Sequence, residues 1–285
     1  MLWLFTHLFS LSAWVMLGMM SAWAGVPALD ASSFADEVVS FHEGEPAASG
    51  KANNAPTLAL GAPSRNRPSV TLGCGGQLVL RFVDNALIDV DGPDLYVFEI
   101  GPNVEATAVA ISMNGHDWVN IGTVAGATAS LDISPYTKRD QSFSYVRLID
   151  LKASCHSATP GADIAAVAAI GSAMRYRFSA AILFDYDQAT LKPAAQDVLQ
   201  AWLQAFHKQA GHLQVNGHSD QFGSEHYNQV LSEKRARAVA HYLQSHLANG
   251  ITLNTQGLGE SQPLVQGETA EETAKNRRVE ILYFP

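Results

Sequence analysis

The sequence has 285 residues, which exceeds the size of one average domain and predicts two. Hydrophobic residues make up 47% and charged residues 16%, proportions that are typical of packed globular domains and exclude a disordered chain. The net charge of −9 argues against non-specific binding to nucleic acid or to an anionic membrane, because both depend on an excess of Lys and Arg.

The first residues have the character of an export signal. Met1–Ala24 contains no Asp, Glu, Lys or Arg, and Leu8–Met20 is almost wholly apolar. Ala22-Trp23-Ala24, just before Gly25, has the small-residue pattern of a signal-peptidase site. We therefore predict a signal peptide over residues 1–24 and no transmembrane span after its cleavage. The alternative is an uncleaved anchor, because the apolar run approaches the length needed to cross a bilayer.

Residues 30–171 have the pattern of an all-β domain. After a loop-like segment rich in Ala, Gly, Asn, Ser and Pro, short apolar runs alternate with turn residues at close intervals. This pattern predicts a β-sandwich. The runs are Gln77–Val83, Leu95–Ile100, Ala108–Met113, Trp118–Val124 and Tyr145–Ile149.

Several turns in this half resemble those of discoidin or galactose-binding-like jelly rolls of exported bacterial proteins. They are Val70–Gly76, Asp89–Glu99, Ser112–Trp118 and Gly161–Ile164. The resemblance implies a jelly-roll-like sandwich used for carbohydrate or surface adhesion. Its partner would be a surface glycan or an envelope protein.

The chain contains two cysteines, Cys74 and Cys155, both in the first half. In an oxidising compartment such a pair favours one disulfide. The alternative is two buried, unpaired thiols.

A cluster of acidic residues surrounds a Gly-Pro turn in the same half. Hard oxygen ligands of this kind suit Ca²⁺, so the sequence predicts a structural calcium site and no other cofactor. The alternative is that these residues form turns through side-chain hydrogen bonds to the backbone. The candidate ligands are Asp84, Asp89, Asp91 and Asp94.

Residues 176–285 alternate strand-like and helix-like segments. In chain order these give βαβαββ, which predicts an α+β domain whose sheet carries its helices on one face. Pro193 is a good first-turn helix residue, and the apolar positions after it recur every three or four residues. The expected segments are a strand at Ala180–Asp187, a helix from Pro193, a strand at Leu213–Gly217, a helix at Ser224–Ala248, and strands at Ile251–Gln256 and Arg278–Phe284.

One stretch of this half carries a recognisable motif. Gly217–Gly223 reads GHSDQFG, and it is followed by Tyr227-Asn228 and by Leu231–Ala236, LSEKRA. The order and spacing resemble the GHTDxxG…YNxxLSxxRAxxV signature of the OmpA-like peptidoglycan-binding family. Gly257–Pro263 and Asn276–Ile281 agree with the same family pattern. The resemblance implies a non-catalytic domain that binds peptidoglycan in the periplasm, beside the cell wall and outer membrane of a Gram-negative-type bacterium.

The chemistry of the motif agrees with that function. Asn228 and Arg235 are seven residues apart on a predicted helix and so share one face, while Asp220 stands at the helix entry. By the resemblance, Asp220 would take the ammonium of meso-diaminopimelate and Arg235 its carboxylate. The alternative is that Asp220 and Arg235 merely pair with each other. The predicted peptidoglycan-binding set is Asp220, Arg235, Asn228, Ser219, Gly223 and Arg278.

Asn276, Arg277 and Arg278 have two equally weighted roles, lining the ligand groove or capping the sheet. No glycosidase, nucleophile or metal-enzyme motif stands in this half, so we predict no enzymatic activity and no catalytic residues.

Three other functions remain open: a carbohydrate-binding adhesin, an envelope-machine subunit of stator or secretion type, and a wall hydrolase. A stator needs a transmembrane helix with an ionisable carrier, which Met1–Ala24 lacks.

Overall fold

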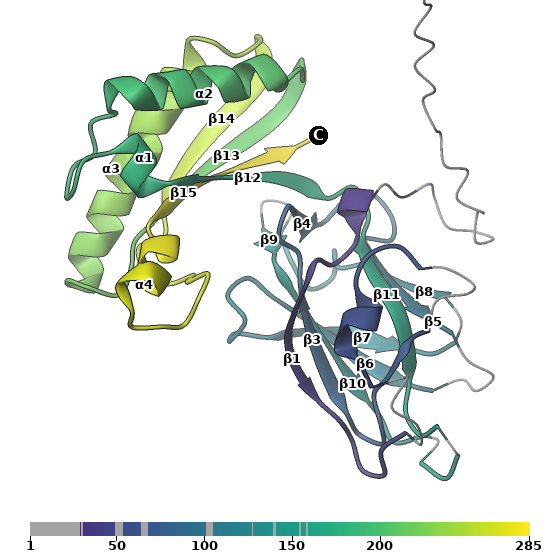
Figure 1. The fold of residues 1–285 in the computed structure, drawn as a ribbon. Coiled ribbons are helices and arrows are strands. Elements are labelled where there is room, and N and C mark those ends of the chain that lie inside the picture. Colours follow the sequence, from purple (N-terminus) through teal and green to yellow (C-terminus); the bar gives the residue numbers. More distant parts are fainter. Residues whose placement is uncertain are drawn as a thin grey trace, which may run out of the picture.

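The computed structural model describes residues 29, 31–48, 54–63, 68–100, 105–126, 128–138, 141–153, 155–157 and 159–285. The predicted signal peptide at Met1–Ala24 lies outside the described residues. The chain forms an N-terminal β domain and a C-terminal α+β domain, joined by strand β12 (Ala173–Ser179) (Figure 1). None of the helices in the described part of the chain is long and apolar enough to cross a bilayer.

The β domain contains two sheets with one shared core. The order is β1-β3-β10-β6-β7 in the first sheet and β2-β11-β5-β8 in the second. Leu80 and Leu148 of the first sheet and Val97 and Val167 of the second belong to the same buried cluster. The strands are β1 (Glu37–His42), β2 (Val70–Thr71), β3 (Gln77–Arg81), β5 (Leu95–Glu99), β6 (Thr107–Ser112), β7 (Val119–Val124), β8 (Thr128–Leu131), β10 (Tyr145–Asp150) and β11 (Asp163–Ala169), with short helices η1 (Ala31–Ser33) and η3 (Pro56–Ala59).

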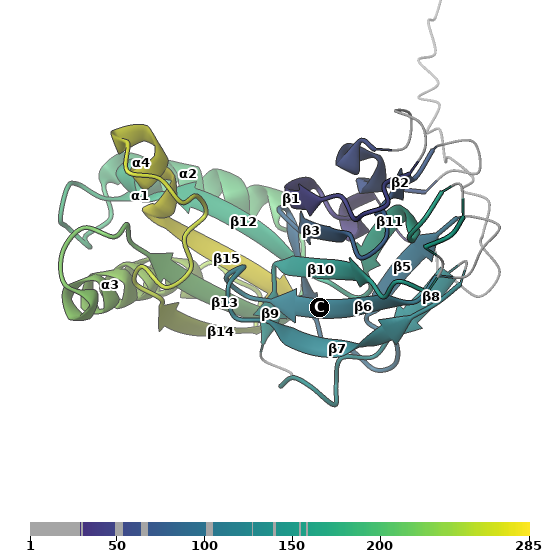
Figure 2. The same cartoon turned by 90° about the horizontal axis from the view of Figure 1, so that it is seen from below.

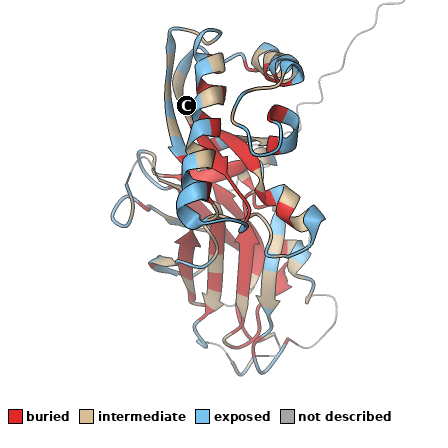
Figure 3. Ribbon diagram, turned by 90° about the vertical axis from the view of Figure 1, so that its left-hand side faces the viewer, coloured by how far each residue is buried: buried red, intermediate tan, exposed pale blue. Residues whose placement is uncertain are grey.

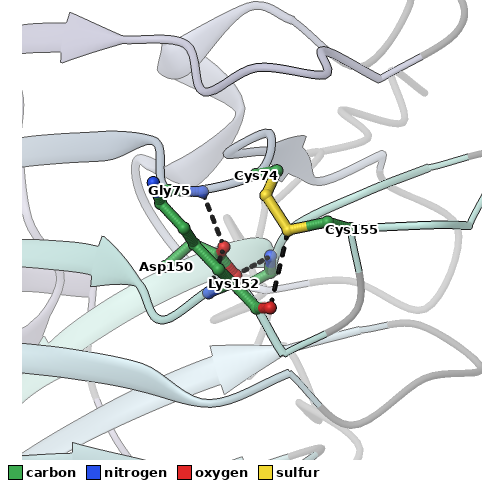
Figure 4. Close-up of a disulfide and its surroundings, with 6 residues drawn as sticks. Cys74, Gly75, Asp150, Lys152 and Cys155 are labelled. Carbon is green, nitrogen blue, oxygen red and sulfur yellow. Dashed lines mark hydrogen bonds between the residues drawn. A yellow bond between two sulfur atoms is a disulfide. The ribbon is translucent and has the colours of Figure 1, made fainter.

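The predicted disulfide is confirmed, since Cys74 and Cys155 are bonded with their Cα atoms 5.2 Å apart (Figure 4). The neighbouring Asp150 ties together the two loops that carry the cysteines. Its Oδ1 accepts hydrogen bonds from the backbone N–H of Gly75 at 2.8 Å and of Lys152 at 2.9 Å. The covalent bond and these hydrogen bonds therefore fix the same end of the β domain.

The C-terminal domain has the expected helices on one face of a sheet. Leu199 of α2 and Val239 and Leu243 of α3 share a buried cluster with Val215 and Ile281 of the sheet. Buried residues concentrate in this core and in that of the β domain (Figure 3). The elements are β12, α1 (Ala180–Leu183), α2 (Pro193–Ala205), β13 (Ala210–His218), α3 (Glu225–Gln244), β14 (Gly250–Gly257), α4 (Ala270–Asn276) and β15 (Arg278–Phe284).

The strand predicted at Ala180–Asp187 is wrong. The strand is β12, which ends at Ser179, and Ala180–Leu183 forms a helical turn. In β12 the aromatic residues Tyr176 and Phe178 pack against the helix-side core, and they alternate with Arg175 and Arg177. This alternation of apolar and charged residues is the period of a strand with two different faces.

The two domains share a sheet. Its strand order is β14-β13-β15-β12-β4-β9, in which β4 (Asn85–Ile88) and β9 (Ser142–Phe143) come from the first half of the chain. Figure 2 shows β14, β13, β15 and β12 side by side. Ala173 and Met174 of β12 pair with Ala86 and Asn85 of β4. The hydrogen-bonded ladder therefore crosses from one domain into the other without a flexible linker.

A buried ion cluster lies on the helix-free face of the shared sheet, next to the β domain. The Glu280 carboxylate is 2.7 Å from Arg278 Nε, 3.0 Å from Arg177 Nε and 3.4 Å from Arg175 Nε. Arg175 also donates hydrogen bonds to the β domain, to Phe82 O at 3.1 Å and to Ser144 Oγ at 2.9 Å. We call Glu280, Arg175, Arg177 and Arg278 the Glu280 cluster, and it connects the domains electrostatically.

His218 stands beside this cluster and is expected to make the fold acid-sensitive. Burial, aided by the positive charge of Arg278, lowers the pKa of His218 to about 3. The unfolded chain takes up this proton near pH 6.5, whereas the folded chain does not until about pH 3. Between these values the free energy of unfolding should therefore fall with decreasing pH, by up to about 1.4 kcal/mol per pH unit for this one group.

Chemical denaturation of the His218→Gln variant between pH 7 and pH 4 checks this expectation. The variant should lose part of the slope of stability against pH. The same substitution at the exposed His207 should leave the slope unchanged. An unchanged slope in His218→Gln would contradict the assignment.

Candidate functional site

The GHSDQFG motif forms the turn between β13 and α3. Gly223 has φ of +107°, a left-handed conformation that favours glycine. Ser224 then caps α3, because its side chain accepts a hydrogen bond from the Tyr227 N–H at 3.2 Å. At Gly217 a Cβ would lie 2.0 Å from Ser232 O, so the sheet and helix can approach only with glycine at this position. These residues set the position of the turn that carries Asp220.

A pocket of about 390 Å³ opens at this turn. It lies between the N-terminal end of α3, the segment that follows α1, and the start of β15. Its charged lining consists of three carboxylates and three cations, so the two signs balance. These residues are Asp185, Asp187 and Asp220, and Lys192, Arg235 and Arg277.

Asp220 is 8% exposed and holds one side of the pocket. Its Oδ2 accepts a short hydrogen bond from Arg277 Nη1, and its Oδ1 accepts one from the Phe222 N–H at 3.2 Å. Asn228 fixes the same turn through Nδ2, which donates to Asp220 O at 3.1 Å and to Glu260 Oε2 at 2.6 Å. The carboxylate is thus held in place while its remaining lone pairs stay available to a ligand.

Arg235 is 5% exposed and lies on the helix side of the pocket. Its Nε donates to Gln188 O at 2.9 Å, and its guanidinium stands over the Phe184 ring, 5.3 Å from the centroid. Burial lowers the pKa of Arg235. Within residues 159–285, all of which are described, Asp220 forms its ion pair with Arg277 rather than with Arg235. The structure therefore does not contain the simple Asp220–Arg235 pair.

Most of the predicted binding residues converge here. Ser219, Asp220, Asn228 and Arg235 line the pocket, and Gly223 shapes the turn beside it. The Oγ of Ser219 is buried and has no hydrogen-bond partner within the described residues.

Arg278 is not part of the pocket, which corrects the prediction. Because side chains alternate along a strand, Arg278 and Glu280 share the helix-free face of β15 and pair there. Arg277, one residue earlier, ends α4 and reaches Asp220 instead. Asn276 clamps a loop, since its Oδ1 accepts from the N–H groups of Leu264 and Val265. Glu280, two positions after Arg278, was the sequence signal that Arg278 faces away from the pocket, because residues two apart on a strand share one face.

Aromatic residues at the mouth of the pocket were not singled out from the sequence. Tyr186 is 94% exposed and Phe222 is 61% exposed, and both line the opening. Tyr227 donates a short hydrogen bond from its hydroxyl to Asp187, which ties α3 to the segment before α2.

The acidic cluster of the β domain differs from the predicted set. Asp89, Asp94 and Asp132 each have a carboxylate oxygen within 4.8 Å of those of the other two residues. This group does not include Asp84 or Asp91. Asp132 was missed because it is distant in sequence. Asp94 is fully buried, and its two oxygens accept hydrogen bonds from the N–H groups of Val90 at 2.7 Å and Ile133 at 2.8 Å. These contacts are those of a turn-forming residue, and burial raises the pKa of Asp94.

The structural calcium predicted at Asp84, Asp89, Asp91 and Asp94 remains a prediction, and Asp132 joins two of these residues as a candidate ligand. A cation that binds only the folded state raises the melting temperature by mass action, so adding Ca²⁺ to chelator-treated protein should raise it. The Asp132→Asn variant should remove the effect while keeping the size of the side chain. Equal melting curves with and without Ca²⁺ would leave these residues as turn formers alone.

Comparison with known proteins supports the resemblance in the second half. Residues 183–277 match the OmpA family. The chain is 40% identical over 105 residues to outer membrane protein A of Bordetella avium, covering 36% of this chain and 54% of that protein. It is 39% identical over 113 residues to outer membrane protein A of Escherichia fergusonii, covering 35% and 46%. The chain thus spans about half the length of these curated relatives.

Among solved structures, the peptidoglycan-associated lipoprotein from Burkholderia pseudomallei aligns with 30% identity and a TM-score of 0.32. The alignment covers 36% of this chain and 87% of that one. The family match and the curated relatives identify the C-terminal half as an OmpA-like domain, which confirms the expectation from the motif. The discoidin-like resemblance of the first half gains no support from them.

Proposed function

We propose that this protein binds peptidoglycan non-covalently through the pocket around Asp220 and Arg235, by holding the meso-diaminopimelate of the stem peptide. The observation that carries the proposal is that one pocket presents a buried carboxylate and a buried guanidinium that are not paired with each other. Such an arrangement suits a ligand with an ammonium and a carboxylate on one carbon.

The charges of the pocket favour a zwitterion over a simple ion. The three carboxylates and three cations of the lining balance, so a ligand with a net positive or negative charge would leave one sign uncompensated. The ammonium would join Arg277 at the Asp220 carboxylate. The ligand carboxylate would take two hydrogen bonds from Arg235 Nη1 and Nη2, because Nε is already used by Gln188 O.

The role is that of a wall attachment and not of an enzyme. The OmpA-like domain would hold the protein at the wall, in the periplasm of a Gram-negative-type cell. The β domain would then bind a partner, either a surface glycan or an envelope protein. Subunits of envelope machines also carry this kind of wall-binding module. A stator- or secretion-type subunit is therefore the second candidate.

Walls that differ only at the diaminopimelate position test the proposal. We expect the full chain to bind sacculi containing meso-diaminopimelate, and to bind lysine-type walls at least about tenfold more weakly, because lysine lacks the second carboxylate. Diaminopimelate whose side-chain carboxylate is amidated should be rejected in the same way. Equal retention on all three walls would rule out this mode of recognition.

A further inference from the structure

A second cavity lies between the shared sheet and the β domain, on the face opposite the helices. Its volume is about 700 Å³, within the range of ligand pockets, which is about 300–1,000 Å³. The sheet wall comes from β13 and β14, and the opposite wall from Lys138, Gln141 and Ser142 of the β domain. We call it the interdomain cleft, and it shares no lining residue with the Asp220 pocket.

Carboxamide side chains dominate the sheet wall of the interdomain cleft. Gln214 and Asn216 of β13 stand in register with Asn254 and Gln256 of β14. Because side chains alternate along strands, these four project from the face opposite Leu213 and Val215, which lie in the helix-side core. Gln214 Nε2 donates to Asn216 Oδ1 at 3.0 Å, and Asn254 and Gln256 on the neighbouring strand β14 are exposed.

The lining of the interdomain cleft is almost uncharged. No carboxylate occurs among the described residues that line it, although the protein has a net charge of −9. Lys138 is the one formal charge among those residues. A carboxamide both donates and accepts hydrogen bonds, so a set of amides suits neutral groups that do the same, such as hydroxyls and other amides.

Apolar side chains complete the cleft. Met113, Leu258 and Phe284 line it beside the amides, and the Phe284 ring lies 5.8 Å from the ring of His212. The acetamido group of an N-acetylated sugar combines a methyl with an amide, and the sugar ring adds apolar faces and hydroxyls. The mixed lining matches this combination better than it matches an ion or a purely apolar ligand.

We propose that the interdomain cleft is a binding site for a neutral chain of N-acetylated amino sugars. The assignment does not depend on diaminopimelate recognition, because the two sites have separate residues. The glycan strand of the wall and a free surface polysaccharide share this chemistry.

Calorimetric titration of the full chain with a tetramer of N-acetylglucosamine tests the proposal. The Asn254→Ala/Gln256→Ala double variant should bind the tetramer at least about tenfold more weakly, since two amide contacts are lost. Maltotetraose, which has hydroxyls but no acetamido group, should bind more weakly than the tetramer. The control is Gln196→Ala/Gln204→Ala, which removes two exposed amides from α2 on the other side of the sheet and should bind normally.

Sacculus binding by the Asp220→Ala protein distinguishes the two sources. Residual binding that disappears on adding the double substitution indicates the wall glycan, whereas tetramer binding without residual wall binding indicates a free polysaccharide. Both outcomes support the site, and neither requires the diaminopimelate pocket to function. The proposal is overturned if the wild type gives no binding heat with the tetramer, if the folded double variant binds it normally, or if maltotetraose binds equally well.

Discussion

Replacing either Asp220 or Arg235 with Ala is expected to weaken binding to diaminopimelate-containing sacculi by about tenfold to a hundredfold. Each residue would contribute charge-assisted hydrogen bonds worth about 1.5–3 kcal/mol. Loss of Asp220 also leaves Arg277 without its partner, so a cation faces the ligand ammonium. Arg235→Lys should fail as well, because an ammonium cannot provide two parallel hydrogen bonds to a carboxylate. A pull-down of full-length protein on purified sacculi measures the effect.

The chain offers a matched control on the same helix. Arg237 is two residues from Arg235, but its guanidinium is exposed and pairs with Glu233 one helical turn earlier. Arg237→Ala should therefore leave binding unchanged, and Asp197→Ala on the exposed side of α2 serves the same purpose for Asp220. Circular dichroism of each variant separates loss of fold from loss of binding. Well-folded Asp220→Ala and Arg235→Ala proteins that are retained like wild type would refute the assignment.

Replacing Glu280 with Ala should lower the free energy of unfolding by about 3–5 kcal/mol, the usual cost of removing one partner from a buried ion pair. Three arginine side chains would lose their common carboxylate in a region shielded from water. Glu280→Gln keeps the shape and still removes the charge, so it should be nearly as damaging. Urea denaturation of the full chain at neutral pH measures both variants.

The pH dependence of the Glu280 effect has a definite sign. Burial raises the pKa of Glu280, but the charge of Arg278, aided by Arg175, outweighs burial and holds that pKa well below its usual value. The stabilisation is therefore present at neutral pH and is lost as the pH falls through the low pKa of the folded state. Glu271, an exposed partner of Lys275, is the control, and its replacement by Ala should change stability by less than about 1 kcal/mol. A Glu280→Gln protein as stable as wild type would contradict the structural role of the Glu280 cluster.

The motif around Asp220 could be identified from the sequence because its residues lie close together along the chain. Asp220, Asn228 and Arg235 lie on one turn and the helix that follows, so helical spacing alone places Asn228 and Arg235 on a common face. The prediction of Arg278 as a pocket residue, where the structure has Arg277, shows the limit of this approach. Their positions depend on where β15 begins, and a shift of one residue moves a side chain to the other face of the sheet.

Contacts between distant segments could not be predicted in the same way. Asp132 joins Asp89 and Asp94 from another loop, and nothing near the Gly-Pro turn indicates it. The pairing of β4 with β12 is similarly hidden, since Asn85–Ile88 is too short to identify as a strand that leaves its own domain. The cysteine pair was the exception, because two cysteines in a chain that is predicted to be exported leave one intramolecular pairing.

The pairing of β4 with β12 also restricts how the protein can move. A single covalent connection would let the β domain swivel about its attachment, but here the connecting strand is itself a member of the shared sheet. Any rotation would have to break this pairing together with the hydrogen bonds from Arg175 to Phe82 and Ser144. If the C-terminal domain is held at a surface, the β domain would therefore keep one fixed direction and one fixed distance from that surface. A flexible linker would not impose this geometry.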